Sequence, residues 1–271
     1  MEFSKARSLF KQLKVCVLIP TYNNEQTLAK VINDVLEYTD QVVIVNDGST
    51  DSTDTILFKF DFLAVVSCPV NEGKGVALRT GFAEAISRGY DYAISIDSDG
   101  QHYASDLPIF LEKLKTSPHA VIIGARNMGQ ASVPGKSSFG NKFSNFWFWV
   151  TSGLTMQDTQ SGYRLYPISQ MTGIKFITRK FEFEIEVLVR SSWRGLAIIH
   201  VPVSVFYPES GKRVSHFRPF TDVTRITILN VFLVLIAVFY IKPRDFFRSL
   251  KKKMQDRSLG SYSKTRQSQT R

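Results

Sequence analysis

The chain of 271 residues is long enough for one substantial α/β domain with an appendage, and its 44% hydrophobic and 21% charged residues exclude a globally disordered protein. Its two cysteines, Cys16 and Cys68, offer neither a disulfide framework nor a zinc-binding pattern. The net charge is +10, and residues 242–271, with ten basic and two acidic side chains, carry +8 of it. Most of the excess charge therefore forms a basic tail.

Strand, polar turn and helix follow one another from the start of the chain. Residues 1–14 lack the apolar core of a signal peptide, so we expect a short lead-in. The apolar run 15–20 predicts a first buried strand. A helix should follow, because apolar residues recur at helical spacing at Leu28, Val31, Ile32, Val35 and Leu36. Residues 41–45 then predict a second strand, and the turn 46–51 is rich in helix-capping residues.

The same alternation continues through the next eighty or so positions. Further strands are predicted at 63–67, 92–96 and 120–124, with helices near 76–87 and 107–114. Strands joined by right-handed crossovers predict an α/β fold with a mainly parallel sheet and helices on both faces. The polar loops should then gather at one edge of the sheet, where such folds bind ligands.

An acidic turn at residues 97–102 directly follows one of these strands. Gly100 lets the backbone turn, so that Asp97, Asp99 and Gln101 can converge on one point. Two carboxylates this close need a cation or a shared proton between them, and oxygen ligands suit Mg²⁺ or Mn²⁺. The alternative, from this stretch alone, is an ordinary polar turn. Residues 73–75 (Gly-Lys-Gly) precede a helix, but neither a dinucleotide-binding nor a P-loop motif is present.

Three stretches in order resemble the inverting glycosyltransferases of family 2: residues 20–23 (Pro-Thr-Tyr-Asn), 45–51 (Val-Asn-Asp-Gly-Ser-Thr-Asp) and 97–101 (Asp-Ser-Asp-Gly-Gln). Two later stretches, 158–164 and 181–186, are most similar to the branch of dolichyl-phosphate mannose and glucose synthases and bacterial polyprenyl-phosphate sugar synthases. The resemblance covers residues 15–206. It implies a GT-A fold, a UDP- or GDP-linked sugar donor and Mg²⁺ or Mn²⁺.

The resemblance also implies roles for individual side chains on the donor side. The nucleotide base or ribose would be contacted by Pro20, Tyr22 and Asp47. The metal that bridges the donor diphosphate would be held by Asp97, Asp99 and Gln101. Arg126 is a candidate second clamp on phosphate, because its planar fork can pair with two oxygens, although a surface arginine at a strand end is equally compatible with its position.

On the acceptor side, Arg164 and Asp158 match family positions, and Arg164 would suit a phosphate-bearing acceptor. A lipid phosphate is largely ionised at neutral pH, since its second pKa is about 6, and needs no protein base. A hydroxyl acceptor would need one, with Glu184, Glu186 or Asp158 as candidates. For Glu186 we favour a structural role within its helix. A basic loop is either the acceptor-side loop or a solvated loop, and its candidate side chains are Lys212, Arg213, His216 and Arg218.

Residues 226–241 are strongly apolar, but fewer than the ~20 residues of a comfortable membrane span. If they spanned once, the basic tail would lie on the side that the positive-inside tendency disfavours. A helix lying in the cytoplasmic leaflet, with the tail on anionic lipid, removes this conflict, and a helix buried on the sheet is the soluble alternative. We therefore expect a protein at the cytoplasmic face of a membrane, peripheral, monotopic or single-pass.

The predicted organisation is a lead-in (1–14), a GT-A domain (15–210), a basic loop and linker (211–225), an apolar membrane helix (226–241) and a basic tail (242–271). The predicted function is inverting, metal-dependent transfer of a sugar from a nucleotide sugar to a polyprenyl phosphate. The alternatives are transfer to a hydroxyl of a glycolipid or polysaccharide precursor, nucleotidyl transfer, and a basic module that binds membrane or nucleic acid. No nucleic-acid fold signature accompanies the tail, so nucleic acid is not an expected partner. The sugar and the oligomeric state stay open.

Overall fold

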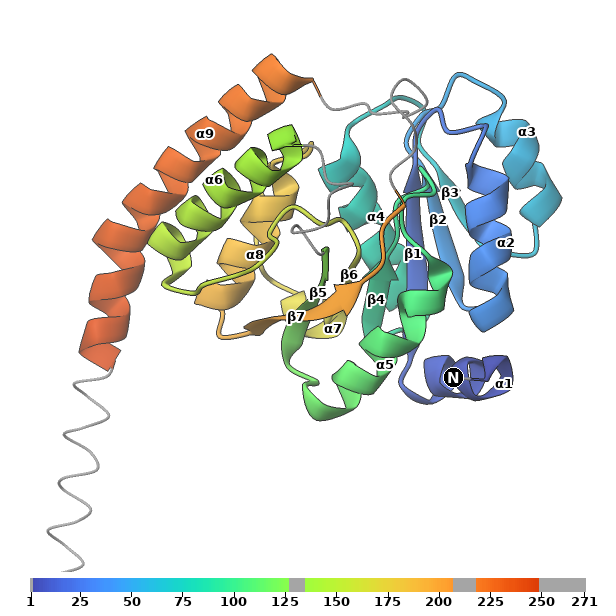
Figure 1. Cartoon of the computed structure of the whole chain (residues 1–271), viewed down its shortest axis with the longest axis horizontal. Helices are drawn as coiled ribbons and strands as arrows, with labels where there is room; N and C mark the ends of the chain where they lie inside the picture. The colour runs from blue at the N-terminus through green and yellow to red at the C-terminus, as the bar shows by residue number, and fades with distance from the viewer. Residues whose placement is uncertain (1, 127–134, 207–217, 249–271) are drawn as a thin grey trace, which may run out of the picture.

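A seven-stranded sheet forms the centre of the computed structural model, which describes residues 2–126, 135–206 and 218–248 (Figure 1). The strand order is β3-β2-β1-β4-β6-β5-β7, and only β6 runs antiparallel to its neighbours, β4 and β5. The strands are β1 (Val15–Thr21), β2 (Val42–Asn46), β3 (Ala64–Ser67), β4 (Tyr92–Ser95), β5 (Ala120–Arg126), β6 (Arg164–Tyr166) and β7 (Ala197–Val203). The predicted, mainly parallel α/β sheet is confirmed.

Helices cover both faces of this sheet. They are α1 (Phe3–Gln12), α2 (Leu28–Tyr38), α3 (Thr53–Leu57), α4 (Lys74–Ser87), α5 (Leu107–Thr116), α6 (Gly135–Ser152), α7 (Ile168–Met171), α8 (Phe183–Trp193) and α9 (Pro219–Ile236). The predicted helices correspond to α2, α4 and α5, and the predicted apolar helix 226–241 falls within the helix that α9 begins, whereas α1 and α6 were not predicted. In α1 the side chains of Ala6, Leu9 and Phe10 are buried, so the lead-in is part of the core.

Two hydrophobic cores result from the alternation of side chains along each strand. In β1, Val15, Val17 and Ile19 face α1, α2 and α5 on one side of the sheet. Cys16 and Leu18 face the other side, where α4, α8 and α9 pack. Because both faces are covered, every residue of β1 is buried, as its continuous apolar run predicted.

The carboxyl ends of β1, β2 and β4 meet at one edge of the sheet. The register pairs Thr21 with Asn46, the last residues of β1 and β2. The next amide along β2, that of Asp47, donates to the carbonyl of Thr21 at 2.9 Å, and the amide of Ile96 donates to Leu18 at 3.0 Å. Residue 47 and the acidic turn 97–102 therefore start from this edge.

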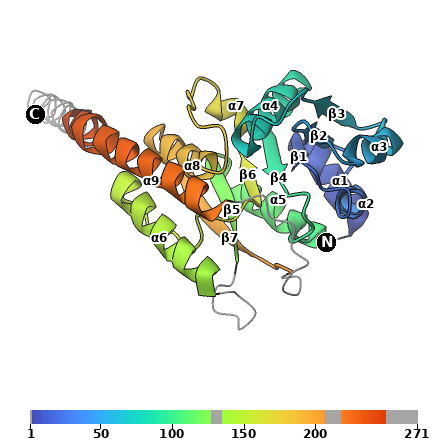
Figure 2. The same ribbon diagram turned by 90° about the horizontal axis from the view of Figure 1, so that it is seen from above.

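Helices α6, α8 and α9 contact one another at the end of the molecule opposite α1 to α3, and Figure 2 shows α6 and α9 side by side. The helix that begins with α9 continues through a π-helical turn, Ala237–Ile241, and spans Phe220–Arg248, which is long and apolar enough to cross a membrane. Only 28% of its most apolar stretch is buried. Exposed apolar side chains on it include Ile228, Val231, Phe232, Leu235, Val238, Phe239 and Tyr240. The helix is therefore longer than the predicted 226–241 and is mostly uncovered.

Candidate functional site

An ammonium group lies at the centre of the edge where the strands end. Lys74 Nζ is 2.8 Å from Asp97 Oδ1 and 2.9 Å from Asp97 Oδ2. It is also 2.7 Å from Glu184 Oε1. Lys74 begins α4, Asp97 follows β4, and Glu184 lies in the first turn of α8, so three elements far apart in the sequence meet at one charge. The three side chains are only 13–25% exposed.

The opposite charges of this cluster stabilise the ionised forms of its side chains. Burial, the largest single influence, would raise the pKa of Asp97, but the charge and hydrogen bond of Lys74, with smaller contributions from His102 and Arg164, together hold that pKa below its ordinary value. Burial would likewise lower the pKa of Lys74, and the carboxylates of Asp97 and Glu184 raise it well above its ordinary value instead. Both partners are therefore charged at neutral pH.

A glycine lies directly against this ion pair. A Cβ atom on Gly162 would lie 2.6 Å from Asp97 Oδ2 and 2.8 Å from Lys74 Nζ, closer than atoms pack. The carbonyl of Gly162 accepts a 2.6 Å hydrogen bond from Ser95 Oγ on β4, which fixes this approach. Neither Lys74 nor Gly162 was predicted as a site residue. The Gly-Lys-Gly sequence at the start of α4 is a signal that could have indicated Lys74.

The rest of the acidic turn is held by local hydrogen bonds. The backbone amide of Gln101 donates to Asp99 Oδ1 at 3.0 Å, and Gly100 adopts a positive φ of 73°, which favours glycine. Thr27 Oγ1 donates to the carbonyl of Ser98 at 2.6 Å and ties the turn to the start of α2. Gln101 Nε2 is buried, and none of the described residues forms a hydrogen bond with it.

The turn fits a divalent cation by the chemistry of its donors. Asp97, Asp99 and Gln101 can each supply an oxygen ligand from one turn. Among the described residues, no group of three or more His, Cys, Asp and Glu side chains lies close enough to hold a metal ion. Asp97 instead faces Lys74, while Asp99 closes the turn. A cation at this turn would thus share Asp97 with Lys74.

The predicted nucleoside-side residues lie at the ends of β1 and β2. Pro20 is buried within β1, and Tyr22, half-buried, follows it. Asp47 is 3% exposed and accepts hydrogen bonds from the backbone amides of Glu72, at 2.9 Å, and Gly73, at 2.8 Å. Burial raises its pKa despite these bonds. Asp47 thus holds residues 72 and 73 in place, directly before Lys74.

Arg126 and Asp158 form a bidentate ion pair. Arg126 Nε is 2.7 Å from Asp158 Oδ2, and Nη2 is 3.0 Å from Oδ1. The carboxylate is fully buried and also accepts the amides of Arg126 and Gln160. Burial would raise the pKa of Asp158, but Arg126 and these hydrogen bonds lower it below the ordinary value. An acid so stabilised in its charged form is a weak proton acceptor.

Arg164 is fully buried beneath the site. Its guanidinium donates to the backbone carbonyls of Ser161 at 2.6 Å, Glu184 at 2.7 Å and Thr159 at 2.9 Å. This geometry differs from the direct acceptor contact that the resemblance implied. With its donors directed at carbonyls, Arg164 joins the segment before β6 to the first turn of α8, which carries Glu184.

Glu186 is also fully buried, on α8. Its carboxylate accepts hydrogen bonds from the amides of Ile177 and Thr178 and from the Thr178 hydroxyl, and pairs with Arg190 at 2.5 Å. It therefore fixes the segment that precedes α8.

The predicted acceptor-side loop is only partly described. Lys212, Arg213 and His216 lie outside the described residues. Arg218 precedes α9, and its backbone amide donates to Asp222 Oδ2 at 2.7 Å. On the other side of the loop, the amide of Phe206 donates to the carbonyl of Gln101 at 2.9 Å. The chain that enters residues 207–217 therefore leaves from beside the acidic turn.

Comparison with known proteins gives consistent matches. The profile of glycosyl transferase family 2 matches residues 16–175. A glycosyltransferase of Haloferax volcanii, AglJ, is 30% identical over 77% of this chain and 68% of its own length. The undecaprenyl-phosphate mannosyltransferase of Micrococcus luteus is 26% identical, covering 74% of this chain and 86% of that protein. The UDP-N-acetylglucosamine–dolichyl-phosphate N-acetylglucosaminyltransferase of Methanococcus voltae is 25% identical, covering 72% and 86%.

Among solved structures, glucosyl-3-phosphoglycerate synthase from Mycobacterium tuberculosis superposes with a TM-score of 0.65. It is 20% identical, and the match covers 86% of this chain and 81% of that one. That structure was determined in complex with Mn²⁺, uridine diphosphate and phosphoglyceric acid. At this identity the likeness concerns the fold, and it confirms the predicted GT-A architecture.

Proposed function

Since the chain belongs to glycosyl transferase family 2, we propose that this glycosyltransferase moves a sugar from a nucleotide sugar to a polyprenyl phosphate at a membrane. Polyprenyl-phosphate and dolichyl-phosphate sugar transferases are among its relatives. The observation that carries the acceptor assignment is the helix Phe220–Arg248, which is apolar, mostly uncovered and attached to the domain that holds the site. This surface supports an acceptor that resides in lipid.

The side chains at the carboxyl ends of the strands support a nucleotide sugar as the donor. The solved structure of the synthase from Mycobacterium tuberculosis contains uridine diphosphate and Mn²⁺. In the present chain, Asp97 and Lys74 lie at the edge where the strands end. Asp97, Asp99 and Gln101 would hold Mg²⁺ or Mn²⁺, which would stabilise as a Lewis acid the charge that develops on the leaving diphosphate. Lys74 adds a fixed positive charge. Pro20, Tyr22 and Asp47 would border the nucleoside.

The proposed reaction is a single displacement with inversion at the anomeric carbon. A phosphate oxygen of the lipid forms the new bond to that carbon while the bond to the diphosphate oxygen breaks, and the nucleoside diphosphate leaves with the electron pair. The phosphate is already ionised at neutral pH, so no side chain has to accept a proton. This agrees with Glu184 and Asp158, whose carboxylates are paired with Lys74 and Arg126.

The test is to incubate membranes that contain the protein with labelled sugar nucleotides, Mg²⁺ or Mn²⁺ and polyprenyl phosphate. Label that enters the organic phase and is released by mild acid would establish a sugar phosphodiester. If the protein binds the nucleotide sugar but forms no lipid-linked product, the acceptor would instead be a hydroxyl group of a glycolipid or polysaccharide precursor. The basic tail supports placement at the cytoplasmic face, which protease accessibility in sealed vesicles would test.

A further inference from the structure

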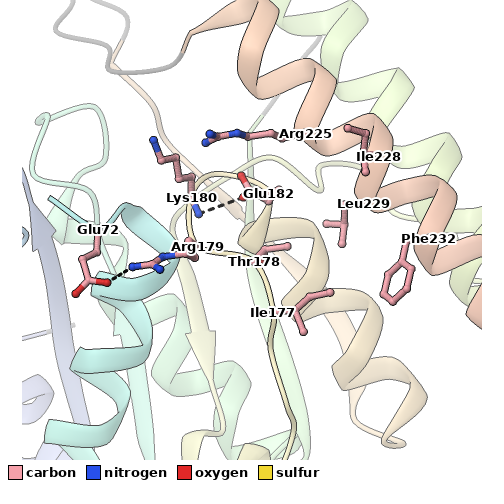
Figure 3. Close-up of a pocket in the computed structure, with 10 residues that line it drawn as sticks. All are labelled: Glu72, Ile177, Thr178, Arg179, Lys180, Glu182, Arg225, Ile228, Leu229 and Phe232. Atoms are coloured by element: carbon pink, nitrogen blue, oxygen red, sulfur yellow. Dashed lines mark hydrogen bonds and ion pairs between the residues drawn. The ribbon is translucent and has the colours of Figure 1, made fainter.

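A cleft of about 410 Å³ lies between the segment before α8 and the first half of α9 (Figure 3). Three cationic side chains line it: Arg179 and Lys180 from the segment, and Arg225 from α9. The wall formed by α9 is otherwise apolar, with Ile228 and Phe232 facing the opening. The cleft thus combines positive charge with hydrocarbon surface.

Two of the three cations form no ion pair within the described ranges, although the positive charge of Lys180 also acts on Asp47. Arg179 is paired with Glu72, whereas neither Lys180 nor Arg225 forms an ion pair with any residue placed in the structure. In Figure 3 their side chains lie on the same side of the cleft, near Glu182. Two uncommitted cations facing one cavity favour an anionic ligand, and phosphate is the group that lysine and arginine bind together most readily.

Glu182 provides an independent sign of a ligand. The residue is 8% exposed, and its Oε1 accepts only a long 3.4 Å hydrogen bond from the amide of Lys180. Its Oε2 is buried and has no hydrogen-bond partner among the residues that the structure describes. A buried carboxylate oxygen without a donor destabilises the protein, because the water that it has lost is not replaced. The cleft therefore suits a ligand that brings a hydroxyl group as well as an anion.

The apolar wall extends along α9 away from the cations. Arg225, Ile228, Phe232 and Leu235 follow one another at steps of three and four residues, so they share one face of the helix. Ile228 is 65%, Phe232 43% and Leu235 50% exposed. A hydrocarbon chain lying along this face of α9 would place a head group beside Arg225 and Lys180.

The cleft borders the candidate active site. The carbonyl of Arg179 accepts a 3.1 Å hydrogen bond from the amide of Val76, in the first turn of α4. A Cβ atom on Gly73 would lie 2.7 Å from that carbonyl and 2.7 Å from Lys180 Cγ. Gly73 is the neighbour of Lys74, which pairs with Asp97. One short stretch of chain therefore separates the cleft from the acidic turn.

We propose that this cleft binds the lipid acceptor. Lys180 and Arg225 hold its phosphate, the Ile228, Phe232 and Leu235 face of α9 carries the first part of its chain, and Glu182 accepts a hydrogen bond from a hydroxyl of the sugar that is transferred. The inference rests on the proposed function and assigns its acceptor site to residues that the sequence did not indicate.

The first test is direct binding to the full-length protein in detergent, without donor. Farnesyl phosphate, farnesol and inorganic phosphate serve as probes by calorimetric titration. Wild type should bind farnesyl phosphate at least about tenfold more tightly than either of the other two, because the site recognises both parts. The double variant Lys180→Gln/Arg225→Gln should lose at least about tenfold in affinity for farnesyl phosphate.

The matched control is Lys175→Gln/Lys242→Gln, which removes the same charge at exposed positions outside the cleft. It should bind farnesyl phosphate within about twofold of wild type. In the enzyme assay, the cleft double variant should raise the KM for the lipid phosphate by a similar factor and leave the KM for the donor unchanged. Glu182→Gln should weaken inhibition by the farnesyl-phosphate-linked sugar while leaving farnesyl phosphate binding intact.

Unchanged binding of farnesyl phosphate by the cleft double variant would overturn the inference. So would a double variant that loses affinity for vesicles of phosphatidylglycerol but keeps the wild-type KM for the acceptor, since the cleft would then hold a phospholipid headgroup. If wild type binds donor but makes no lipid-linked sugar, the proposed function fails, and the binding titration still decides whether the cleft recognises a lipid phosphate.

Discussion

Lys74 Nζ lies 2.8 Å from Asp97 Oδ1, so the first residue of α4 neutralises the first acid of the turn that follows β4. The same ammonium reaches Glu184 of α8 at 2.7 Å. Positive charge is thus built into the place where the proposed reaction releases a diphosphate. A metal ion at the turn would share this field with the lysine.

Lys74→Met should destabilise the protein in metal-free buffer by about 3 kcal/mol, because the carboxylates of Asp97 and Glu184 then face each other without a cation. A divalent cation can replace the lost charge, so Mn²⁺ should raise the thermal midpoint more in the variant than in wild type. Lys175→Met, at an exposed position, is the control. A thermal midpoint that does not respond to Mn²⁺ in the variant would argue against a cation site at Asp97.

Gly162→Ala should lower kcat/KM for the donor at least about tenfold, because the added methyl displaces Asp97 and Lys74 from each other. Gly140→Ala is the matched control, since its Cβ would meet Gln160 Nε2 at an acceptable 3.4 Å. Steady-state kinetics with each variant, alongside circular dichroism to confirm folding, makes the comparison. Equal activities for both variants would contradict the assigned geometry.

Asp99→Asn should reduce transfer by at least about 10²-fold, since it removes a charged ligand from the proposed metal site. The asparagine oxygen can still accept the 3.0 Å hydrogen bond from the amide of Gln101, so the thermal midpoint should change little. Asp91→Asn, which alters a surface ion pair with Lys14, is the control for charge. Wild-type turnover in Asp99→Asn would remove this residue from the metal assignment.

Asp158→Asn should cost about 3 kcal/mol at neutral pH, because it removes the negative charge that faces the largely buried guanidinium of Arg126. The pKa of Asp158 is lowered below its ordinary 3.8 in the folded state. Its contribution is therefore fully present above about pH 4 and is lost as the pH falls through the lower, folded-state value. Urea unfolding at several pH values should show the difference from wild type shrinking in acid. A difference that stays constant with pH would contradict this pairing.

Glu186→Ala should destabilise the fold by about 3 kcal/mol, because the amides of Ile177 and Thr178 and the guanidinium of Arg190 lose their acceptor. The segment it holds lines the acceptor cleft, so the KM for the lipid phosphate should rise as well. Glu112→Ala, which breaks an exposed pair with Lys115, should change stability by no more than about 0.5 kcal/mol. Similar losses in both variants, measured by chemical denaturation, would refute the structural role of Glu186.

Much of the scaffold was predictable because its signals are local. The continuous apolar run of β1 and the helical spacing from Leu28 to Leu36 reflect which faces are buried, and they gave elements close to those observed. Helix α6 was missed, since aromatic residues are distributed around it rather than along one stripe: Phe143, Phe146 and Trp149 are exposed while Phe148 is buried. The structure packs α6 against α8 and α9, which are distant in the sequence, so local periodicity could not indicate it.

The sequence alone determined the alternation of strands and helices, the acidic turn at the end of β4 and the family to which these motifs belong. Tertiary structure decided which charges meet. Lys74 pairs with Asp97 and Glu184, Arg126 with Asp158, and the predicted acceptor residue Arg164 is buried against backbone carbonyls. The physical reason is that periodicity and turn chemistry depend on neighbours along the chain, whereas the field at a buried charge depends on groups brought together from distant elements when the sheet and its helices pack.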